Sequence, residues 1–511
     1  MKLVISRLFA AADSFFNWAF GQRGNPLVHL GALGWYFFWI VAATGIYLYI
    51  FFDTGVTDAY ASVEYMTNVQ WYAAGVMRSL HRYASDALVF IALLHMLREF
   101  ALDRLRGKRF FAWVTGIATL AFIYACGITG YWLVWDKLAQ FIAVSTAEWL
   151  DALPFFAEPI ANNFLNSTTL SGRFFTLMVF MHIFAPLFML LLMWVHIQRH
   201  AQAKVNPPRP LAIGTLLMLL ALSFVHPATS QGPADLDVVP VSVGLDWFYL
   251  AGYALLDFVP AGTLWLLAAV AGAFLLLLPW MPPAKPEPVA VVSLDNCNGC
   301  ARCFDDCPFS AISMAPRSDG LAYTAEAVVN PDNCVSCGIC VGACPTATPF
   351  RRATEVIPGI ELPEHPIAEL RDRTLAAAEA MDGNSRVLVY ACERSGADSL
   401  EKTNVRVLSM PCLGMLPPAF IDFALSRDLA DGVMLAGCAE GGCHYRLGND
   451  WTQHRIDRSR DPFLRKRVPQ ERLTVSWLPN GSSQRKQALD AFAAELPDMP
   501  VMPRRRRSAN D

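Results

Sequence analysis

Charged residues are scarce in the first part of this 511-residue chain. Residues 1–290 contain 16 Lys or Arg and 16 Asp or Glu, whereas the shorter remainder contains 25 and 28. Cysteine is almost missing from the same part, because Cys126 precedes residue 290 and the other twelve follow it. A hydrophobic content of 54% argues against disorder, and a net charge of −3 argues against a general nucleic-acid binder. The sequence therefore predicts a membrane part joined to a soluble part that uses cysteine.

Several apolar runs in the first part reach the length of about 20 residues that crosses a bilayer. The run 210–226 is shorter and lies at the lower limit. Buried helices of a soluble protein do not explain six such runs with so few charges. The predicted spans lie near 30–52, 76–100, 110–135, 173–198, 210–226 and 261–282.

Basic residues are absent from two loops, 53–77 and 227–260, whereas the loop 98–109 is rich in them. Because basic loops stay on the inside, the N-terminus and everything after residue 282 are predicted to lie in the cytoplasm of a prokaryote. The first 16 residues predict an amphipathic helix on the inner surface of the membrane, with a cleaved signal peptide as the alternative.

Four of the ten histidines share one spacing. His81 and His95 lie 14 residues apart on the second predicted span, and His182 and His196 lie 14 apart on the fourth. Fourteen residues make almost four helical turns and rise about 21 Å, so each pair shares a helix face. Because both spans run from outside to inside, His81 meets His182 at one depth and His95 meets His196 at the other. Two such sites suit two haems better than zinc, since each level offers only two ligands.

Glycine repeats the same spacing on two other spans. Gly31 and Gly45 lie 14 residues apart on the first span, and Gly116 and Gly130 lie 14 apart on the third. Glycine lets a bulky planar group approach the backbone, so these four are predicted to pack against the haems. The alternative is that each is one of the glycines common in membrane helices.

Residues 1–282 resemble the cytochrome b of quinol-oxidising bc-type complexes. The resemblance is carried by RSLHRYASDALVFIALLH at 78–95, GYWLVWDK at 130–137, and LSGRFFTLMVFMHIFAP with WVH within 170–196. It implies two b-type haems, with Arg78 as a propionate ligand or, alternatively, a membrane anchor. The axial ligands that it implies are His81, His182, His95 and His196.

The segment VGLDWFYLAGYALL at 243–256 resembles the quinol-oxidation loop of that family, with Asp246 in place of a Glu. The third span also departs, because VWD at 134–136 replaces Pro-Trp-Gly. A carboxylate beside a quinol can accept a proton, so Asp246 is a candidate catalytic residue, with an ordinary interfacial Asp as the alternative. Arg199 and His200 are candidates to form a second quinone site or to bind haem propionates. The alternative is that they are simple positive-inside anchors.

An internal repeat of 37 residues follows a Pro-rich linker at 283–292. The pattern C-x₂-C-x₂-C-x₃-C-P begins at Cys297 and again at Cys334. This is the spacing of ferredoxins with two [4Fe–4S] clusters, in which the fourth cysteine ligates the other cluster. Disulfides conflict with the cytoplasmic placement, and zinc does not need the Cys-Pro. The predicted ligand sets are Cys297, Cys300, Cys303 and Cys344 for one cluster and Cys334, Cys337, Cys340 and Cys307 for the other.

Short apolar runs alternate with helical stretches from about residue 385, which predicts a parallel sheet with helices. Strands are predicted at 386–392, 405–410, 432–438 and 473–478, and helices at 417–427 and after 443. Four cysteines end or follow these strands and should converge at the carboxyl edge of the sheet. They suit a [2Fe–2S] cluster, with zinc or a redox dithiol as alternatives. The four are Cys392, Cys412, Cys438 and Cys443.

Residues 386–478 resemble the delta subunit of methyl-viologen-reducing hydrogenase, an iron–sulfur partner of heterodisulfide reductase. The resemblance is carried by CERSGAD at 392–398, MPCLGMLPP at 410–418 and AGCAEGGCHYRLGND at 436–450. That family often has a further cysteine three residues before Cys392, where this chain has Val389.

Together these patterns predict a multi-domain fold: an α-helical transmembrane cytochrome b bundle, an α+β dicluster ferredoxin domain and a C-terminal α/β parallel-sheet domain. The predicted domains are residues 1–282, 293–355 and 385–480, followed by a helix and a basic tail at 481–511.

The predicted function is electron transfer between the membrane quinone pool and a cytoplasmic flavin or iron–sulfur oxidoreductase of heterodisulfide-reductase type, by a homodimer. G-x-G-x-x-G and a Ser–His–Asp grouping are absent, so the cofactors carry the chemistry. One alternative is a non-catalytic redox sensor or membrane anchor that has lost quinone chemistry. Another is a complete enzyme that acts on a thiol or sulfur compound at the C-terminal cysteines.

Overall fold

The computed structural model describes residues 2–154, 165, 170–198, 203–246, 248–281, 288–320, 322–350, 356–480 and 482–500. Arg199, His200, the first half of the Pro-rich linker and the basic residues near the C-terminus lie outside the described residues. The chain forms two compact units, one of residues 1–198 with 203–284 and the other mainly of residues 285–511. Each unit has its own hydrophobic cores.

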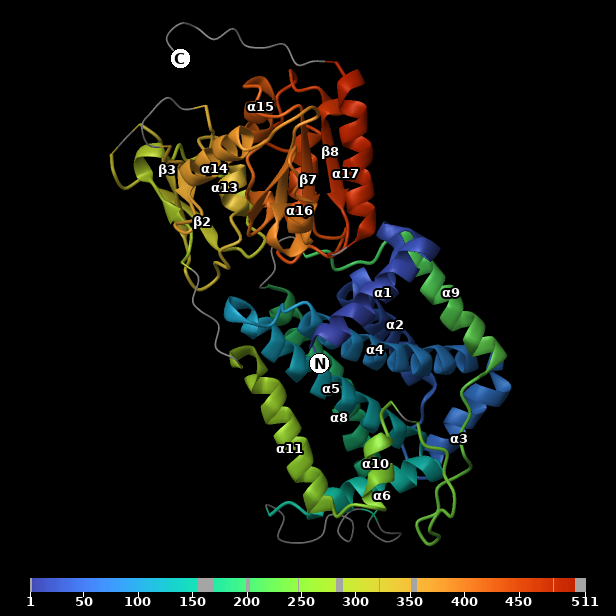
Figure 1. The fold of residues 1–511 in the computed structure, drawn as a ribbon. Helices are drawn as coiled ribbons and strands as arrows, with labels where there is room; N and C mark the ends of the chain where they lie inside the picture. The colour runs from blue at the N-terminus through green and yellow to red at the C-terminus, as the bar shows by residue number, and fades with distance from the viewer. Residues whose placement is uncertain are drawn as a thin grey trace, which may run out of the picture. The chain divides into compact units, whose positions relative to one another are not determined.

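The first unit is a bundle of helices (Figure 1). Its helical core pairs α2 with α4 and α5 with α8, and α9 packs on α4. Leu33, Phe37, Leu88 and Met189 are among the buried side chains that hold these helices together. The helices are α1 (Lys2–Phe20), α2 (Leu30–Phe51), α3 (Asp58–Glu64), α4 (Val76–Ala101), α5 (Phe110–Val134), α6 (Lys137–Asp151), α8 (Gly172–Gln198), α9 (Arg209–Val225), α10 (Ala251–Leu256) and α11 (Ala261–Leu277).

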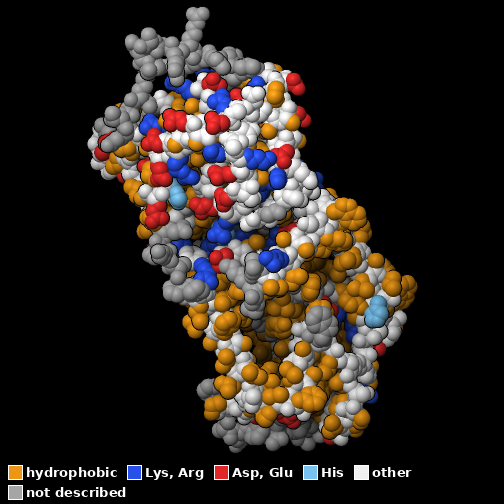
Figure 2. All heavy atoms as spheres, in the orientation of Figure 1, with side chains coloured by type: hydrophobic (Ala, Val, Ile, Leu, Met, Phe, Trp, Pro, Cys, Tyr) orange, Lys and Arg blue, Asp and Glu red, His pale blue; other side chains and the backbone are white. Residues whose placement is uncertain are grey.

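Apolar side chains cover much of the outer surface of this unit, which is the reverse of a water-soluble protein. Phe184 and Leu187 on α8 and Leu266 and Phe274 on α11 are exposed, and Figure 2 shows hydrophobic side chains over the first unit and charged ones over the second. Within the described residues, four helical segments are long and apolar enough to cross a membrane. They are Pro26–Phe51, Gly107–Val134, Phe175–Gln198 and Ala261–Trp280. The chain is therefore a multi-pass membrane protein.

Two of the six predicted spans fall outside this set for physical reasons. Helix α4 is 26 residues long but carries charged residues, among them Arg82, Asp86 and Arg98. Helix α9 has 17 residues, and the shorter apolar helices include it. The buried Arg98 of α4 forms an ion pair with Asp13, which ties the amphipathic α1 to the bundle.

The segment VWD at 134–136, which replaces the Pro-Trp-Gly of the family pattern, has a structural role. Trp135 ends α5 with φ 50°, and the Asp136 side chain then caps α6 by accepting a hydrogen bond from the Ala139 N–H at 2.9 Å. The other Asp136 oxygen accepts from the Gln231 N–H at 2.8 Å. Asp136 thus fixes both the start of α6 and the loop 227–260.

The second unit begins with a small α+β part. Two short antiparallel sheets pair β1 with β4 and β2 with β3. The elements are β1 (Val291–Val292), α12 (Arg302–Asp306), β2 (Ile312–Pro316), β3 (Ala325–Val329), α13 (Ile339–Ala343) and β4 (Ile360–Glu361). The antiparallel pairs place the two cysteine-bearing helices α12 and α13 in contact.

The C-terminal part is a four-stranded parallel sheet in the order β6-β5-β7-β8. Side chains alternate along β5, so that Val387 and Val389 pack with Leu489 and Phe492 of α17, whereas Leu388 and Tyr390 face α14 and α15. The elements are α14 (Ile367–Glu379), β5 (Val387–Cys392), β6 (Val405–Met410), α15 (Ala419–Ser426), β7 (Gly432–Gly437), α16 (Gly448–Ile456), β8 (Leu473–Trp477) and α17 (Ser483–Glu495). The predicted fold class is confirmed.

Candidate metal centres

The His81 and His182 rings face each other across the bundle. Their centroids lie 6.4 Å apart and their planes make an angle of 61°. A metal–imidazole bond is about 2 Å long, so this separation fits one metal ion bound by both rings. The two rings that the spacing pairs therefore lie close together, and their ligation of one haem stays a prediction.

Hydrogen bonds decide which nitrogen of His81 is free to bind a metal. Nδ1 lies 3.0 Å from the carbonyl oxygen of Val41, which can only accept, so Nδ1 carries the proton. The Thr44 hydroxyl donates to the Ile40 carbonyl at 2.7 Å and lies 3.1 Å from the same Nδ1. Nε2 is left as the unprotonated nitrogen, which is the metal-binding form.

The same arrangement occurs at two further histidines. Nδ1 of His182 lies 3.1 Å from the Thr129 hydroxyl, and Nδ1 of His196 lies 3.0 Å from the Thr115 hydroxyl. Each threonine donates to a backbone carbonyl of its own helix, so its oxygen lone pairs remain available to accept from Nδ1. Three of the four histidines are thus oriented by a threonine of the neighbouring helix.

The four glycines lie behind the four histidine rings. A Cβ on Gly45 would lie 3.0 Å from His81 Cε1, and a Cβ on Gly130 would lie 3.0 Å from His182 Cε1. The corresponding distances are 3.4 Å from Gly116 to His196 and 3.6 Å from Gly31 to His95. Each glycine therefore lies against a histidine ring, and its packing against haem stays a prediction.

Sequence reasoning missed the threonines, although the sequence contains the signal. A Thr-Gly dipeptide occurs at 44–45, 115–116 and 129–130, and each serves one histidine. Gly31 follows Leu30 instead, and a Cβ on Gly31 would lie 3.6 Å from Cε1 and 3.7 Å from Nε2 of His95. His95 lies within electrostatic range of His196, the other member of its predicted pair.

Asp246 lies in a network of charged and polar side chains between α4, α5 and the loop 227–260. Its carboxylate is bound by Arg82 and by the Tyr131 hydroxyl, and Arg82 also pairs with Asp86. The Arg82 guanidinium lies 4.7 Å from the Tyr131 ring centroid. Burial raises the pKa of Asp246, but hydrogen bonds from Tyr131 and Arg82 outweigh it and hold the pKa below its usual range. Asp246 is therefore an ionised partner of Arg82 near neutral pH.

Tyr249 stands beside this network and closes the gap between α4 and α5. Its hydroxyl lies 2.7 Å from Ser85 Oγ, and a Cβ on Gly127 would lie 2.0 Å from its ring. Gly127 therefore makes the space that Tyr249 occupies. Arg78, at the start of α4, hydrogen-bonds to Thr67 and, at 2.9 Å, to Ser230.

The eight cysteines of the repeat gather around two cavities. Each cavity is lined by three cysteines of one repeat and the fourth of the other, which is the crossed pattern predicted from the spacing. Within the described residues, no three His, Cys, Asp or Glu side chains form a site for a single metal ion. The first pocket is lined by Cys297, Cys300, Cys303 and Cys344, and the second by Cys307, Cys334, Cys337 and Cys340.

The four C-terminal cysteines are buried and form a chain of neighbouring thiols. Cys392 Sγ lies 3.7 Å from Cys438 Sγ, and Cys443 hydrogen-bonds to both Cys438 and Cys412. A Cβ on Gly448 would lie 2.3 Å from Cys412 Sγ, so only glycine leaves room for that thiol. The hydrogen bond with Cys392 and burial raise the pKa of the Cys438 thiol to about 12. Metal binding at this site must therefore displace protons.

Val389 has no access to this site. It is fully buried on the face of the sheet that packs against α17, whereas Cys392 belongs to the core on the opposite face. Residues three apart on a strand point to opposite faces. A cysteine at 389 would therefore require a different strand geometry to join the four thiols.

Three family models match the chain. The model for cytochrome b/b6/petB covers residues 25–202, that for the 4Fe-4S dicluster domain covers 296–348, and that for the methyl-viologen-reducing hydrogenase delta subunit covers 386–499.

Cytochrome b6 of Trichodesmium erythraeum (strain IMS101) is 30% identical over 201 residues, which are 39% of this chain and 90% of that protein. The solved structure of a hyperthermophilic respiratory complex III covers 49% of this chain and 74% of its own, at 18% identity and a TM-score of 0.42.

Proposed function

This chain belongs to the cytochrome b family and joins such a cytochrome to a 4Fe-4S dicluster domain and a hydrogenase delta-subunit domain, and on that premise we propose that it links the quinone pool to a cytoplasmic oxidoreductase. Membership implies haem b in the first unit and [4Fe–4S] clusters in the second. The protein is thus a membrane electron-transfer subunit. The cofactors supply one-electron transfer when bound, and the chain supplies position, orientation and electrostatics.

The observation that carries the proposal is the set of oriented histidines. His81 and His182 would hold one haem, and His95 and His196 the other. The threonine and carbonyl partners keep Nδ1 protonated on three of them, so that Nε2 is free as the ligand. Gly45 and Gly130 leave the space that these rings need.

The cysteines of the second unit would hold the remaining centres. The two pockets of four cysteines match the donor set of two [4Fe–4S] clusters, and the lining supports the crossed assignment. Cys392, Cys412, Cys438 and Cys443 are four buried thiols in one place, which supports a [2Fe–2S] cluster there.

The charge of the loops supports an outer quinol site and cytoplasmic clusters. The loops 53–77 and 227–260 lack Lys and Arg, and the second contains Asp246. Tyr131 and Arg82 orient the Asp246 carboxylate, which would accept a proton from bound quinol if Arg82 releases it and keeps its ion pair with Asp86.

The partner class rests on the hydrogenase delta-subunit resemblance, and purification tests it. The chain is extracted in mild detergent under anaerobic conditions, and the soluble proteins that copurify are identified and assayed for flavin and iron. We expect a flavin or iron–sulfur oxidoreductase of heterodisulfide-reductase type. Copurification with outer quinol-oxidising partners alone would contradict the proposal.

A second candidate, a redox sensor or membrane anchor without quinone chemistry, is favoured by one observation. The Asp246 carboxylate is already bound by Arg82 and Tyr131, which leaves it less free to act as a base. The two functions differ in the response of the haems to quinol, since only an electron-transfer subunit is reduced by it.

A further inference from the structure

A buried arginine occupies the contact between the dicluster part and the C-terminal sheet. Arg455 on α16 has an exposed fraction of 0%. Its Nη1 donates to the Gly414 carbonyl at 2.8 Å, and its Nη2 donates to the Ile339 carbonyl at 3.3 Å and to the Asp306 carboxylate. Burying a guanidinium without partners costs free energy, so these three acceptors fix the position of the Arg455 side chain.

Each of these three acceptors is next to a cysteine of a candidate centre. Asp306 immediately precedes Cys307, and Ile339 lies between Cys337 and Cys340, all three of which line the second pocket. Gly414 lies two residues after Cys412 of the C-terminal site. One guanidinium therefore joins the loops of two centres, and Cys337 lies within electrostatic range of Cys412.

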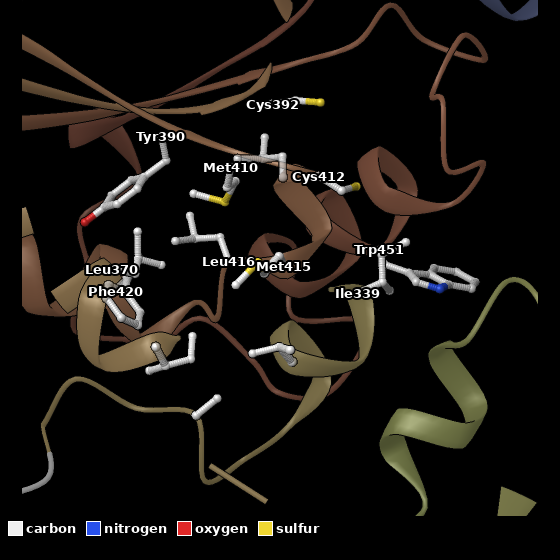
Figure 3. Close-up of a cluster of buried hydrophobic side chains, with 14 of the residues drawn as sticks. Ile339, Leu370, Tyr390, Cys392, Met410, Cys412, Met415, Leu416, Phe420 and Trp451 are labelled. Atoms are coloured by element: carbon white, nitrogen blue, oxygen red, sulfur yellow. The ribbon is translucent and has the colours of Figure 1, made fainter. Parts of the chain in front are cut away.

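The backbones around Arg455 approach closely. A Cβ on Gly342 would lie 2.1 Å from the Gly414 oxygen, and a Cβ on Gly338 would lie 2.8 Å from Met415 Cγ. Figure 3 shows Ile339 beside Met415, with Cys412 and Trp451 nearby. These side chains belong to one hydrophobic core that contains cysteines of both centres.

Two arginines share one carboxylate at this contact, because Asp306 pairs with both Arg455 and Arg460. The Arg455 guanidinium thus lies beside segments that carry cysteines of two centres. The net charge around an iron–sulfur cluster and the hydrogen bonds to it set its reduction potential.

We propose that Arg455 is a positioning residue that holds the second four-cysteine pocket against the C-terminal four-cysteine site and raises the reduction potential of both centres. This inference rests on the proposed function, because it requires an iron–sulfur cluster both in the second four-cysteine pocket and at the C-terminal four-cysteine site. Within the described residues, none of the hydrogen-bond acceptors of Arg455 lines the first pocket, so the largest effect is expected at the second pocket and the C-terminal site.

The test is a redox titration of the whole protein followed by electron paramagnetic resonance, together with iron analysis. We expect R455M to shift the reduction equilibrium of one [4Fe–4S] cluster and of the C-terminal cluster at least tenfold toward the oxidised forms. Tenfold corresponds to about 59 mV for a one-electron couple. The other [4Fe–4S] cluster should keep its wild-type potential.

Arg485 provides the matched control, because it is also buried and donates to the carbonyls of Gly437 and Leu478 at 2.8 and 2.6 Å. It lies within electrostatic range of Cys392 and Cys438, and its hydrogen bonds involve none of the residues that line the second pocket. R485M should therefore shift the C-terminal potential alone. If R455M shifts neither potential, or only the C-terminal one as R485M does, the proposal is wrong.

The variant R455K keeps the charge but loses the forked hydrogen bonds. We expect near-normal potentials and a weaker magnetic interaction between the two reduced centres. An unchanged interaction would overturn the positioning role even if R455M fails to fold. Iron analysis separates a failure of this inference from a failure of the proposed function. If the wild-type protein holds no iron at the C-terminal cysteines, the cluster assigned to that site in the proposed function is wrong.

Discussion

Gly45 of α2 lies directly behind the His81 ring of α4, because a Cβ at that position would come within 3.0 Å of His81 Cε1. A Cβ on Gly34 of the same helix would lie 3.9 Å from Leu88 Cδ1, which is an ordinary contact. Alanine at position 45 would therefore crowd the His81 ring, whereas alanine at position 34 adds a methyl group to α2 without crowding a histidine.

If His81 and His182 hold one haem and His95 and His196 the other, as proposed, G45A should lose the first haem and keep the second. The added methyl displaces the ring, and the bond to the metal depends on its position. G34A should retain both haems. Haem per protein, measured from the absorbance of the extracted haem, checks this, and full haem content in G45A would contradict it.

The hydroxyl of Thr129 orients His182, so T129V should weaken haem retention at that level by about 10–100-fold. The rate of haem transfer to a scavenger protein measures this effect. Thr146 on α6 hydrogen-bonds to Tyr253 at 2.8 Å instead of to a histidine. T146V should therefore lose haem at the wild-type rate, and equal rates in the two variants would refute the orienting role.

The ion pair between Asp246 and Arg82 predicts an effect on quinol chemistry. D246N removes the proposed proton acceptor and the charge that holds Arg82, so quinol-dependent haem reduction should slow by about 100-fold. Asp257, at the end of α10 in the same loop, provides the control D257N, which should react at the wild-type rate. A wild-type rate for D246N would exclude Asp246 from proton transfer.

The lowered pKa of Asp246 gives a pH signature. Stability from a carboxyl with a lowered pKa is complete above the ordinary Asp value of about 3.9 and disappears as the pH falls through the lowered value. The difference in melting temperature between wild type and D246N should therefore stay constant from about pH 5 to 8 and vanish in stronger acid. A difference that fades between pH 5 and 8 would contradict the ion pair.

The position of Val389 predicts the outcome of a rescue experiment at the C-terminal site. C392S should lose the C-terminal cluster, and adding V389C should fail to restore it, because residue 389 faces α17 on the other side of the sheet. C126S serves as the control, since Cys126 lies on α5 in the first unit and should leave all cluster iron in place. Iron analysis and paramagnetic resonance check the series, and restored signal in the double variant would refute this geometry.

Local patterns made much of the fold predictable. The predicted strand at 405–410 coincides with β6, and the run at 110–135 coincides with α5 within one residue. The 14-residue spacing of histidines and glycines also led to the right helices, because a helical period converts spacing into a shared face. The cysteine spacing predicted two crossed sets of four cysteines, and each set lines one pocket.

Long-range partners were beyond the reach of these patterns. Arg82 and Asp246 are 164 residues apart, and nothing in either segment indicates that they pair. Arg455 looks like a surface charge in the sequence, yet it is fully buried because three segments that are distant in the sequence supply its acceptors. Helix α17, predicted to lie beyond the sheet domain, supplies Leu489 and Phe492 to the core of that sheet.

Reduction of the haems by quinol is the most direct test of the proposed link between the quinone pool and this protein. The whole protein, loaded with both haems and reconstituted in lipid vesicles without oxygen, is mixed with a soluble quinol while the haem absorbance is recorded. We expect quinol to reduce the haems of the wild-type protein. Reduction of the iron–sulfur centres should follow once the cytoplasmic partner is present. In D246N the reduction of the haems should be much slower. Fully oxidised wild-type haems after prolonged exposure to quinol would contradict the proposed link and would identify the chain as a sensor or anchor.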